Sequence, residues 1–368
     1  MNLAWLNEGV AKEVVRGIAL VVGVSLAWAT PAAYGDFDIV VPAYFYPTNN
    51  GPWDDLADAA GSAPITAIMN PASGPGTQQD ANYVTAVNAL RAAGGRVIAY
   101  VHTSYGARDL ATVLQEIDRY DAFYEIDGIF LDEMANTGPA ERLDYYRSIY
   151  DYVKGIDPLW EVMGNPGTNT LQQYLTWPAA DRLVVYEREG SFYPGHAEDA
   201  WNHDYDRSHF VNLVHTEGAT ALADDLTLAK ARNVGGIYIT DDVMNNPWDR
   251  LPSYWTSEVA AVAQLNASYL EGDFNVDGLV DGDDLERWNA FFGRSTNAWH
   301  VEGDAQRDGD VDGGDFLIWQ RQRGSVAPGS AVSGSVFSVP EPTTSLAATA
   351  ASLFGAAFRR DRKRMTQR

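Results

Sequence analysis

The stretch Asp127–Glu133 reads DGIFLDE, a short apolar run that ends in two adjacent carboxylates. An apolar, β-rich run with acids at its carboxyl end is the way a barrel or an open α/β sheet presents functional groups. Side chains alternate along a strand, so Ile129 and Leu131 are expected against covering helices, with Asp132 pointing inward and Glu133 at the rim. The alternative is that the two acids only cap the next helix and face solvent. The rest of the chain decides between these interpretations.

Seven other apolar, β-branched or aromatic runs share this pattern, and helix-like segments separate them. Helical spacing is visible, for example, in Leu143, Tyr146, Tyr150 and Val153. Eight strands that each precede a helix predict an α/β fold, a (β/α)8 TIM-type barrel over residues 36–270. An open doubly wound sheet is the alternative, but the glycine-rich phosphate loop that usually follows its first strand is missing. The eight runs are DIVVPAYFYP (38–47), PITAIMNP (64–71), GRVIAYVHT (95–103), DGIFLDE (127–133), WEVMGNPG (160–167), RLVVYE (182–187), HFVNLVHT (209–216) and GGIYITDD (235–242).

Polar side chains stand at the carboxyl end of all eight runs. In a barrel these ends converge on one mouth, so their coincidence predicts a binding site there. Any one of them alone would suit a helix cap or a turn, as with Asn70 and Asn165, which both precede proline. The candidate substrate-binding residues are Tyr44, Tyr46, Asn70, His102, Tyr105, Asn165, His215, Asp241 and Asp242.

Two carboxylates from different strands, bordered by aromatic and amide side chains, suit glycoside hydrolysis. In that reaction one acid protonates the leaving oxygen and the other acts as nucleophile or base. The candidate catalytic residues are Asp132, Glu133 and Glu187. Adjacent acids on one strand point to opposite faces, so the pair is Asp132 or Glu133 with Glu187, and not Asp132 with Glu133. We assign Glu187 as general acid/base and Asp132 as nucleophile or stabiliser, with Glu133 tuning it. Neither an HExxH metal motif nor a GxSxG nucleophile elbow occurs in the chain.

Two other functions stay open at this point. A metal-dependent deacetylase would hold its ion with His102 and His215. A catalytically silent barrel would instead bind polysaccharide and act as a cell-surface or matrix component. The orientation of Asp132 and Glu187 discriminates between hydrolysis and binding alone, because a carboxylate that pointed into the helix layer would favour the binding-only function.

Seven pieces of the barrel region, in order, carry a family resemblance: VPAYFYP, the MNP of 69–71, YVHTSYG, DGIFLDE, GNPG, VVYE and YITDD. Together they resemble the spherulin-4-like family (spherulation-specific family 4), which is related to glycoside hydrolases acting on α-1,4-linked galactosamine polymers. The resemblance implies an amino-sugar-containing exopolysaccharide as substrate and catalysis by the acids that end strands four and six, here Asp132, Glu133 and Glu187. Chitinase-like barrels differ, since their DGxDxDxE pattern would need acids where Phe130 and Met134 stand.

The segment from Glu271 to Gly324 holds thirteen acidic residues against five arginines, which indicates cation binding. Its stretches GDFNVDGLVDGDD and DAQRDGDVDGGD place oxygen ligands at alternating positions of a calcium loop, with glycine at the sharp turn of position 6. An acidic solvated linker is the alternative, and the position-matched duplication disfavours it. With the carbonyl of position 7 included, the candidate Ca²⁺ ligands are Asp273, Asn275, Asp277, Leu279, Asp281 and Asp284 in one loop, and Asp304, Gln306, Asp308, Asp310, Asp312 and Asp315 in the other.

The two loops and the aromatic-bearing helices expected after them resemble a type I dockerin. The resemblance implies a small all-α calcium-binding module over residues 271–324, with a cohesin-like protein as its partner. Gln306 departs from the pattern as a weaker ligand at position 3. The pairs Gly282–Asp283 and Gly313–Gly314 occupy places where cohesin-reading dockerins often carry hydroxyl residues. These departures leave calcium better supported than the cohesin-like partner.

The composition bounds the size of the fold and its partners. With 368 residues, of which 46% are hydrophobic and 12% aromatic, the chain can bury a large core and form more than one domain. A net charge of −24 argues against nucleic acid as a partner. The absence of cysteine excludes disulfides and thiolate metal sites.

Both ends of the chain predict export. Lys12 and Arg16 precede an apolar run and then small residues, as in a secretory signal peptide over 1–33. A flexible linker is expected over 325–338, followed over 339–368 by VPEP, an apolar segment and a basic RRDRKR tail. This tripartite tail resembles the PEP-CTERM sorting signal of bacteria. It implies a secreted or cell-surface bacterial protein that meets the export and sorting machinery.

Overall fold

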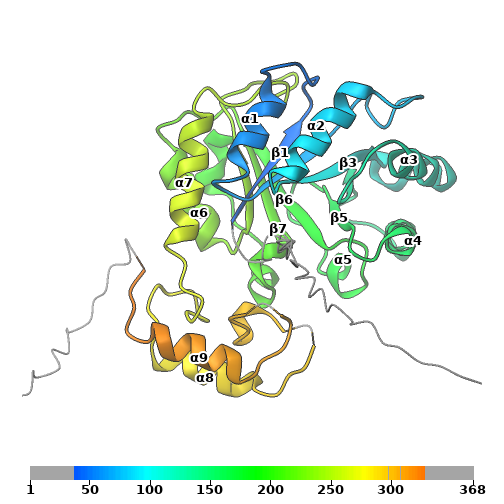
Figure 1. Cartoon of the computed structure of the whole chain (residues 1–368). Coiled ribbons are helices and arrows are strands. Elements are labelled where there is room, and N and C mark those ends of the chain that lie inside the picture. The colour runs from blue at the N-terminus through cyan, green and yellow to red at the C-terminus, as the bar shows by residue number, and fades with distance from the viewer. Residues whose placement is uncertain (1–36, 297, 307, 328–368) are drawn as a thin grey trace, which may run out of the picture.

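Eight parallel strands close into a barrel in the order of the sequence (Figure 1). The computed structural model describes residues 37–296, 298–306 and 308–327. The predicted (β/α)8 TIM-type barrel is confirmed. The strands are β1 Asp38–Ala43, β2 Ile65–Met69, β3 Arg96–His102, β4 Gly128–Asp132, β5 Glu161–Gly164, β6 Arg182–Glu189, β7 Phe210–His215 and β8 Gly236–Ile239.

Three predicted segments fall largely beyond these residues. The signal peptide (1–33), the sorting tail (339–368) and all but the first three residues of the linker (325–338) lie outside the described part of the chain. Within the described part, no helix has both the length and the apolar character needed to cross a membrane.

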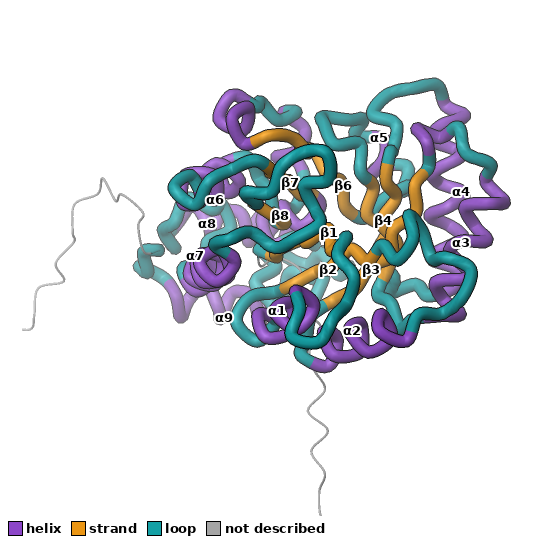
Figure 2. The backbone as a smooth tube through the Cα atoms, turned by 90° about the horizontal axis from the view of Figure 1, so that it is seen from above, coloured by secondary structure: helices purple, strands orange, loops and turns teal. Residues whose placement is uncertain are grey.

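Helices surround the barrel on its outside, as the view from above shows (Figure 2). One connection differs from the prediction that a helix follows every strand. Between β6 and β7 the chain forms three short 3-10 helices, η2 Gly190–Gly195, η3 Ala200–Asp204 and η4 Arg207–His209. Pro194 lacks an N–H and the glycines of η2 are poor helix formers, so an α-helix is disfavoured there. The barrel helices are α1 Pro52–Ala59, α2 Ala81–Ala92, α3 Leu110–Phe123, α4 Ala140–Ile156, α5 Gln173–Thr176, α6 Leu222–Ala231 and α7 Trp255–Ala267.

The decisive stretch DGIFLDE forms β4 as its alternation predicts. Ile129 and Leu131 are fully buried, and the ring of Phe130 packs on Tyr100 of β3 with centroids 6.3 Å apart. Gly128 begins the strand where the backbones of β4 and β5 approach closely. A Cβ added at Gly128 would lie 2.2 Å from the carbonyl oxygen of Glu161, so only glycine fits there.

Charged side chains fill the base of the barrel, at the amino-terminal ends of the strands. Arg182 donates to both carboxylate oxygens of Asp38, at 2.8 and 2.7 Å. Glu161 is fully buried and accepts from Arg96 at 2.7 Å. Removing one partner of such a buried pair leaves an uncompensated charge, which typically costs about 3–5 kcal/mol. These ion pairs fill the amino-terminal end of the barrel. We therefore look for a binding site at the opposite end, where the strands finish.

A small second unit follows α7 and lies below the base of the barrel (Figure 1). It contains α8 Gly282–Phe291, the 3-10 helix η5 His300–Glu302 and α9 Gly313–Gln322, and we call it the module. The module has its own core of Phe274, Val280, Ala305, Ile318 and Trp319, which is separate from the barrel core.

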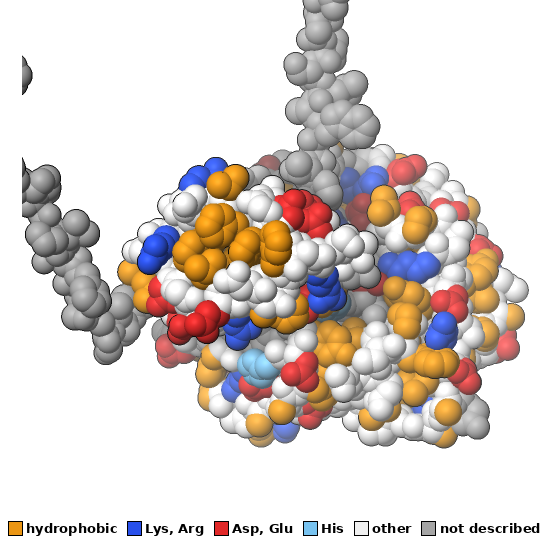
Figure 3. Space-filling model, turned by 90° about the horizontal axis from the view of Figure 1, so that it is seen from below, with side chains coloured by type: hydrophobic (Ala, Val, Ile, Leu, Met, Phe, Trp, Pro, Cys, Tyr) orange, Lys and Arg blue, Asp and Glu red, His pale blue; other side chains and the backbone are white. Residues whose placement is uncertain are grey.

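The module extends beyond the expected boundary at Gly324. Val280 N donates to Ser325 O at 3.1 Å and Ala327 N donates to Gly278 O at 2.8 Å, so the first residues of the expected linker supply partners for the backbone of the first acidic loop. Hydrophobic side chains gather on the surface seen from below (Figure 3), and the exposed large apolar residues of the module are Phe291, Phe292, Leu317 and Val326.

Candidate active site

Asp132 of β4 and Glu187 of β6 are joined in the mouth of the barrel by one amide. Asn165 follows β5, the strand between them, and its Nδ2 donates to Asp132 Oδ1 at 2.8 Å and to Glu187 Oε2 at 2.6 Å. Because one nitrogen bonds both oxygens, these oxygens lie at most about 5.4 Å apart. The two carboxylates face one another across the mouth and not into the helix layer.

The second oxygen of Asp132 also has a donor. Tyr100 of β3 donates its hydroxyl to Asp132 Oδ2 at 2.8 Å. Burial, and then the charge of Asp132, raises the pKa of Tyr100, so this hydroxyl keeps its proton. Asp132 thus accepts a hydrogen bond on each of its two oxygens, and these bonds fix the position of its carboxyl group.

Glu187 sits in a different environment from Asp132. Burial raises the pKa of Glu187 to about 7, and the nearby charge of Asp132 adds to the increase, while hydrogen bonds with Asn165 and Trp248 oppose it. Glu187 is therefore protonated below about pH 7 and is suited to donate a proton. A carboxyl group that burial keeps protonated beside a second carboxyl group is the pattern of an acid paired with a nucleophile.

Aromatic rings enclose this pair. Tyr44, after β1, meets Tyr100 edge to face at 5.5 Å, and burial followed by the charges of Asp132 and Glu187 raises its pKa. Trp248, in the loop after β8, packs edge-on against His215 at 5.7 Å and accepts a backbone hydrogen bond from Tyr44 at 3.2 Å. Such rings exclude water from the carboxyl pair and offer apolar faces on which a sugar ring can stack.

Glu133 holds a strained backbone beside the pair. Its φ of 50° lies in the left-handed region, which a residue with a side chain rarely adopts. Its carbonyl oxygen accepts from Thr103 Oγ1 at 2.8 Å and from Tyr105 N at 2.7 Å, and these two bonds fix the conformation. Strain that the surroundings hold in place is a feature of functional sites. Glu133 is partly exposed at the rim, as its sequence position predicts.

Three other predicted residues also line the mouth. His102 ends β3 beside Tyr100, with ring centroids 6.5 Å apart. His215 ends β7, and its Nδ1 shares a hydrogen bond of 2.9 Å with Thr216 Oγ1, while burial lowers its pKa. Tyr105 is 58% exposed in the 3-10 helix η1 Ser104–Gly106 and is available for stacking.

Three predicted binding residues have local partners instead of joining the carboxyl pair. Asn70 accepts from Gly74 N at 2.9 Å and closes its own loop. Asp241 pairs with Arg250 at 2.7 Å, and Asp242 is buried and accepts from Val243 N at 2.9 Å. Each of these side chains stabilises its own loop. This is the alternative to a binding role that holds for any single polar residue at the end of a strand.

Tyr46 points toward the start of α2, where its hydroxyl donates to Asp80 Oδ2 at 2.9 Å and accepts from Asn82 Nδ2 at 2.9 Å. Asp80 and Asn82 line a cavity of about 420 Å³ in the loop between β2 and α2. Tyr46 is half-exposed and belongs to this outer part of the rim.

Tyr100 and Thr103 were not selected as site residues by sequence reasoning. Tyr100 lies two residues before His102 on the same strand and shares its inward side, so the alternation that selects His102 also selects Tyr100. Thr103 is fully buried, its hydroxyl hydrogen-bonds two backbone carbonyls and a tyrosine hydroxyl, and no sequence signal marks that role.

The acidic loops of the module repeat one geometry. Gly278 and Gly309, at position 6 of each loop, have φ of 87° and 86°, the left-handed turn that the pattern requires of glycine. Gly278 N donates to Asp273 Oδ2 and Gly309 N donates to Asp304 Oδ2 at 2.8 and 2.9 Å. The last acid of each loop, Asp284 or Asp315, completes a capping box at the start of the following helix.

The donor set of these loops fits a hard cation. Among the described residues, Asp310, Asp312 and Asp315 bring carboxylate oxygens within 4.8 Å of one another. Burial raises the pKa of Asp273 to about 6, and the charges of Asp284 and Asp277 add to the increase. A bound cation would relieve the repulsion between carboxylates that lie this close together, and oxygen ligands of this kind suit Ca²⁺.

Comparison with known proteins places the barrel in a family. The model of spherulation-specific family 4 matches residues 38–262, from the start of β1 into α7. Spherulin-4 of Physarum polycephalum is 33% identical over 240 residues, which is 62% of this chain and 70% of that protein. The chain belongs to spherulation-specific family 4. Among solved structures, Sph3 of Aspergillus clavatus in complex with GalNAc is similar to this family member, with a TM-score of 0.56 and 26% identity over 63% of this chain and 99% of that one. The family match ends before the module.

Proposed function

We propose that the chain is a secreted glycoside hydrolase that cleaves an amino-sugar-containing exopolysaccharide, of the α-1,4-linked galactosamine type. The observation that carries the proposal is the bridge of Asn165 between Asp132 and Glu187, which brings two carboxyl groups of unlike environment into one mouth. The family membership and the GalNAc bound to Sph3 support an amino sugar as the recognised unit.

The surroundings of the two acids support a different role for each. Glu187, protonated below about pH 7, donates its proton to the glycosidic oxygen as the bond to the anomeric carbon breaks. Asp132, held by Tyr100 and Asn165, attacks the anomeric carbon from the other side and forms a glycosyl ester. Glu187, now a carboxylate, takes a proton from water, and the resulting hydroxide displaces Asp132 from the sugar.

The separation of the carboxylates favours retention of configuration. Retaining glycosidases hold their carboxyl groups about 5–5.5 Å apart, whereas inverting enzymes leave about 6.5–9.5 Å for a water molecule. The limit of about 5.4 Å between Asp132 Oδ1 and Glu187 Oε2 fits the first class.

Release of new reducing ends from an α-1,4-galactosamine polymer tests this proposal. We expect release by the unaltered chain and a loss of at least about a thousandfold in Glu187→Gln and Asp132→Asn, because each removes one half of a two-acid mechanism. Glu125→Gln, an acid-to-amide change at an exposed side chain just before β4, at the opposite end of the barrel, serves as the matched control and keeps its activity. If none of the proteins releases reducing ends from this or other exopolysaccharides while all of them bind the polymer, the barrel is a binding module of the surface or matrix.

We also propose that the module binds two Ca²⁺ ions and attaches the enzyme to a partner outside the cell. The paired left-handed glycines and the crowded carboxylates of both loops support the calcium, and the resemblance to a type I dockerin supports a cohesin-like partner. Display at the surface of a bacterium by way of export and sorting machinery rests on the signal-peptide and PEP-CTERM patterns of the sequence.

A further inference from the structure

Arg108 joins His102, at the mouth end of β3, to the helix α3. Its Nη1 donates to Glu116 Oε2 at 2.8 Å and to the carbonyl oxygen of His102 at 2.9 Å, and its Nη2 donates to Glu116 Oε1. The side chains of Arg108 and Glu116 are only 16% and 14% exposed. An ion pair with two parallel bonds, largely shielded from water, holds the guanidinium in one orientation. The position of this group beside His102 is therefore fixed.

The same guanidinium faces one ring nitrogen of His102. Arg108 Nη1 lies 3.4 Å from His102 Nδ1, at the long end of hydrogen-bonding distance. One N–H of Nη1 bonds Glu116, so the other is shared between the carbonyl oxygen and Nδ1 of His102. An arginine has donors only, and a proton on Nδ1 would bring one N–H against another. From these contacts we assign Nδ1 as the acceptor, so that a neutral His102 carries its proton on Nε2.

The other ring nitrogen of His102 is available in the mouth. His102 pairs with Asp132 in the register of β3 and β4, and its ring lies beside Tyr100, whose hydroxyl bonds Asp132. His102 is partly exposed, and its Nε2 has no hydrogen-bond partner among the described residues. A donor without a protein partner, next to the proposed nucleophile, is well placed to bind a substrate.

This proton assignment disfavours a function that the sequence leaves open, a metal-dependent deacetylase with His102 and His215 as ligands. A histidine that binds a metal through one ring nitrogen almost always donates the N–H of the other to a carboxylate, a carbonyl oxygen or water. The group beside His102 Nδ1 is a guanidinium, which cannot accept. The charge of Arg108 would also repel a cation. His102 is thus suited to donate a hydrogen bond and not to hold a metal.

We propose that Arg108 is a positioning residue, which keeps the proton of His102 on Nε2 so that this nitrogen donates to an oxygen atom of the bound sugar. A hydroxyl or an acetamido carbonyl can accept such a bond, whereas a protonated amino group cannot. The inference rests on the hydrolase proposed above only for the identity of the ligand, because the position of the proton is a property of the free protein.

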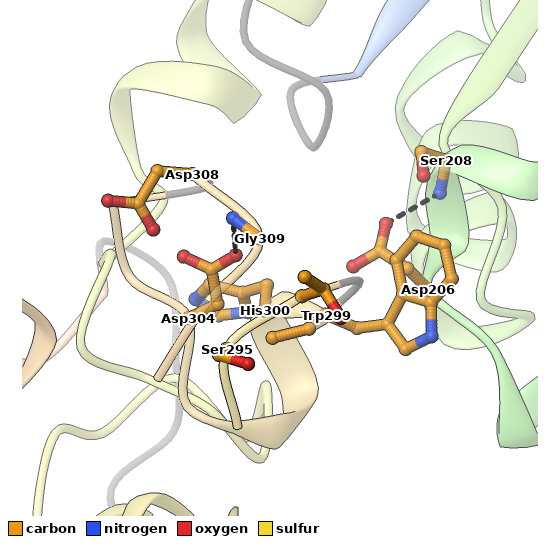
Figure 4. A pocket seen from close by; sticks show the side chains of 10 residues that line it. Asp206, Ser208, Ser295, Trp299, His300, Asp304, Asp308 and Gly309 are labelled. Carbon is orange, nitrogen blue, oxygen red and sulfur yellow. Dashed lines mark hydrogen bonds between the residues drawn. The ribbon is translucent and has the colours of Figure 1, made fainter. Parts of the chain in front are cut away.

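Long-range ¹H–¹⁵N NMR of the histidine rings locates this proton in the unaltered full chain at about pH 8, where an ordinary histidine is neutral. The chain has six histidines, and His102 is identified by the signals that disappear in His102→Gln. Two others are internal standards, because a carbonyl oxygen can only accept. His209 Nδ1 bonds Asp181 O at 2.6 Å, and His300 Nε2, beside the cavity between barrel and module (Figure 4), bonds Glu271 O at 3.0 Å. We expect the pattern of His102 to match that of His300, and a match with His209 would overturn the proposal.

A pair of variants shows whether Arg108 sets the position of the proton. Glu116→Gln keeps the guanidinium beside His102, and Arg108→Met in the same chain then removes it without leaving an unpaired carboxylate. We expect the Nε2–H pattern in Glu116→Gln. In the double variant we expect added signals from a ring protonated on Nδ1, because the acceptors that Arg108 occupied are then free. An unchanged His102 pattern in the double variant would overturn the proposal.

Two controls accompany these spectra. Arg119→Met makes the same change on the exposed side of α3 and should keep the His102 pattern of the unaltered chain. Unchanged signals of the other five histidines show that each variant is folded.

Kinetics on a galactosamine polymer tests the contact with the sugar. A donor that binds the sugar equally before and during the reaction affects KM and not kcat. We therefore expect KM to rise by about 5-fold or more in the double variant relative to Glu116→Gln, with kcat within about twofold. A loss confined to kcat would overturn the proposal, because Arg108 would then act on the carboxyl pair. If the chain releases no reducing ends, the hydrolase proposal fails, the dissociation constant of the polymer replaces KM, and the NMR result still decides the position of the proton.

Discussion

Tyr100 shows how one side chain beneath the site controls a carboxylate. Its hydroxyl is the donor to Asp132 Oδ2, and its ring is held between Tyr44 and Phe130. A hydrogen bond to a charged group is worth about 1.5–3 kcal/mol. Tyr100 therefore positions Asp132, the proposed nucleophile.

We expect Tyr100→Phe to lower kcat by about 10- to 100-fold because Asp132 loses one of its two donors. Steady-state kinetics over a range of pH measures this, and the decline of activity above about pH 7, which Glu187 sets, should stay in place. Tyr120→Phe is the matched control, since Tyr120 is fully buried in α3 and its hydroxyl has no hydrogen-bond partner among the described residues. If the Tyr100→Phe variant were as active as the control, Tyr100 would have no role in positioning Asp132.

At the scale of single residues, the sequence places the acids better than their neighbours. Asp132 and Glu187 are selected by their position at strand ends, and the structure brings them together through Asn165, which is selected in the same way. Asn70 and Asp241 satisfy the same rule, yet they serve their own loops. The position of a residue along its strand predicts at which end of the barrel it lies. The hydrogen-bond partner of its side chain depends on the conformation of the loops, which the sequence does not predict.

One irregularity in β6 decides the orientation of Glu187. Arg182, at the start of the strand, points into the base of the barrel, and Glu187 follows five residues later, an odd number. Strict alternation would put Glu187 on the outer face. A shift of register between Val184 and Tyr186 changes the parity, so that Glu187 faces the mouth. No residue type in RLVVYE signals such a bulge, and the sequence alone therefore could not establish this orientation.

Glu258 of α7 fills a gap in the strand pairing. β1 pairs with β8 only through Asp38 and Ile39, so the later part of β8 lacks a partner strand on that side. Glu258 is fully buried, and its Oε1 accepts from Ile239 N at 2.8 Å. Burial raises its pKa well above the ordinary value of 4.5.

This buried acid makes stability depend on pH. The folded protein holds the proton of Glu258 more tightly than the unfolded chain, so its contribution to stability is fully present below pH 4.5 and is lost as the pH rises. We expect Glu258→Gln to remove this loss. The free energy of unfolding of the variant, measured with urea, should match that of the unaltered chain near pH 4 and exceed it by up to about 1.4 kcal/mol for each pH unit above 4.5. A constant difference across this range would show that Glu258 is not protonated in the fold.

At the scale of the whole molecule, the sequence predicts the division into barrel and module, because a change in composition and a duplicated loop mark the second unit. It does not predict that the module contacts the base of the barrel through Trp299 and His209. Such a contact depends on the shapes of the folded barrel and the folded module, and no local sequence pattern predicts it. The placement leaves the mouth open to a polymer, since the module lies at the opposite end of the barrel (Figure 1).

Two separate cores predict two unfolding transitions. Calcium at a free concentration a hundredfold above its dissociation constant stabilises by about 2.7 kcal/mol for one site, which corresponds to about 10–20 °C in a unit as small as the module. We expect a chelator to lower the module transition by this amount and to move the barrel transition much less. Calorimetry with and without chelator measures both, and a single transition indifferent to calcium would contradict the two-core interpretation.

The most direct test of the proposed hydrolase activity follows the first product in time. The bridge of Asn165 keeps Asp132 Oδ1 and Glu187 Oε2 within about 5.4 Å of one another, which supports a retaining pair, so we expect a polymer of α-linked galactosamine to give an α-configured reducing end first. Proton NMR recorded within the first minutes, before the product equilibrates, distinguishes the two anomers. An α product that later converts to the mixture is the expected result, and a β product at the earliest time would contradict attack by Asp132.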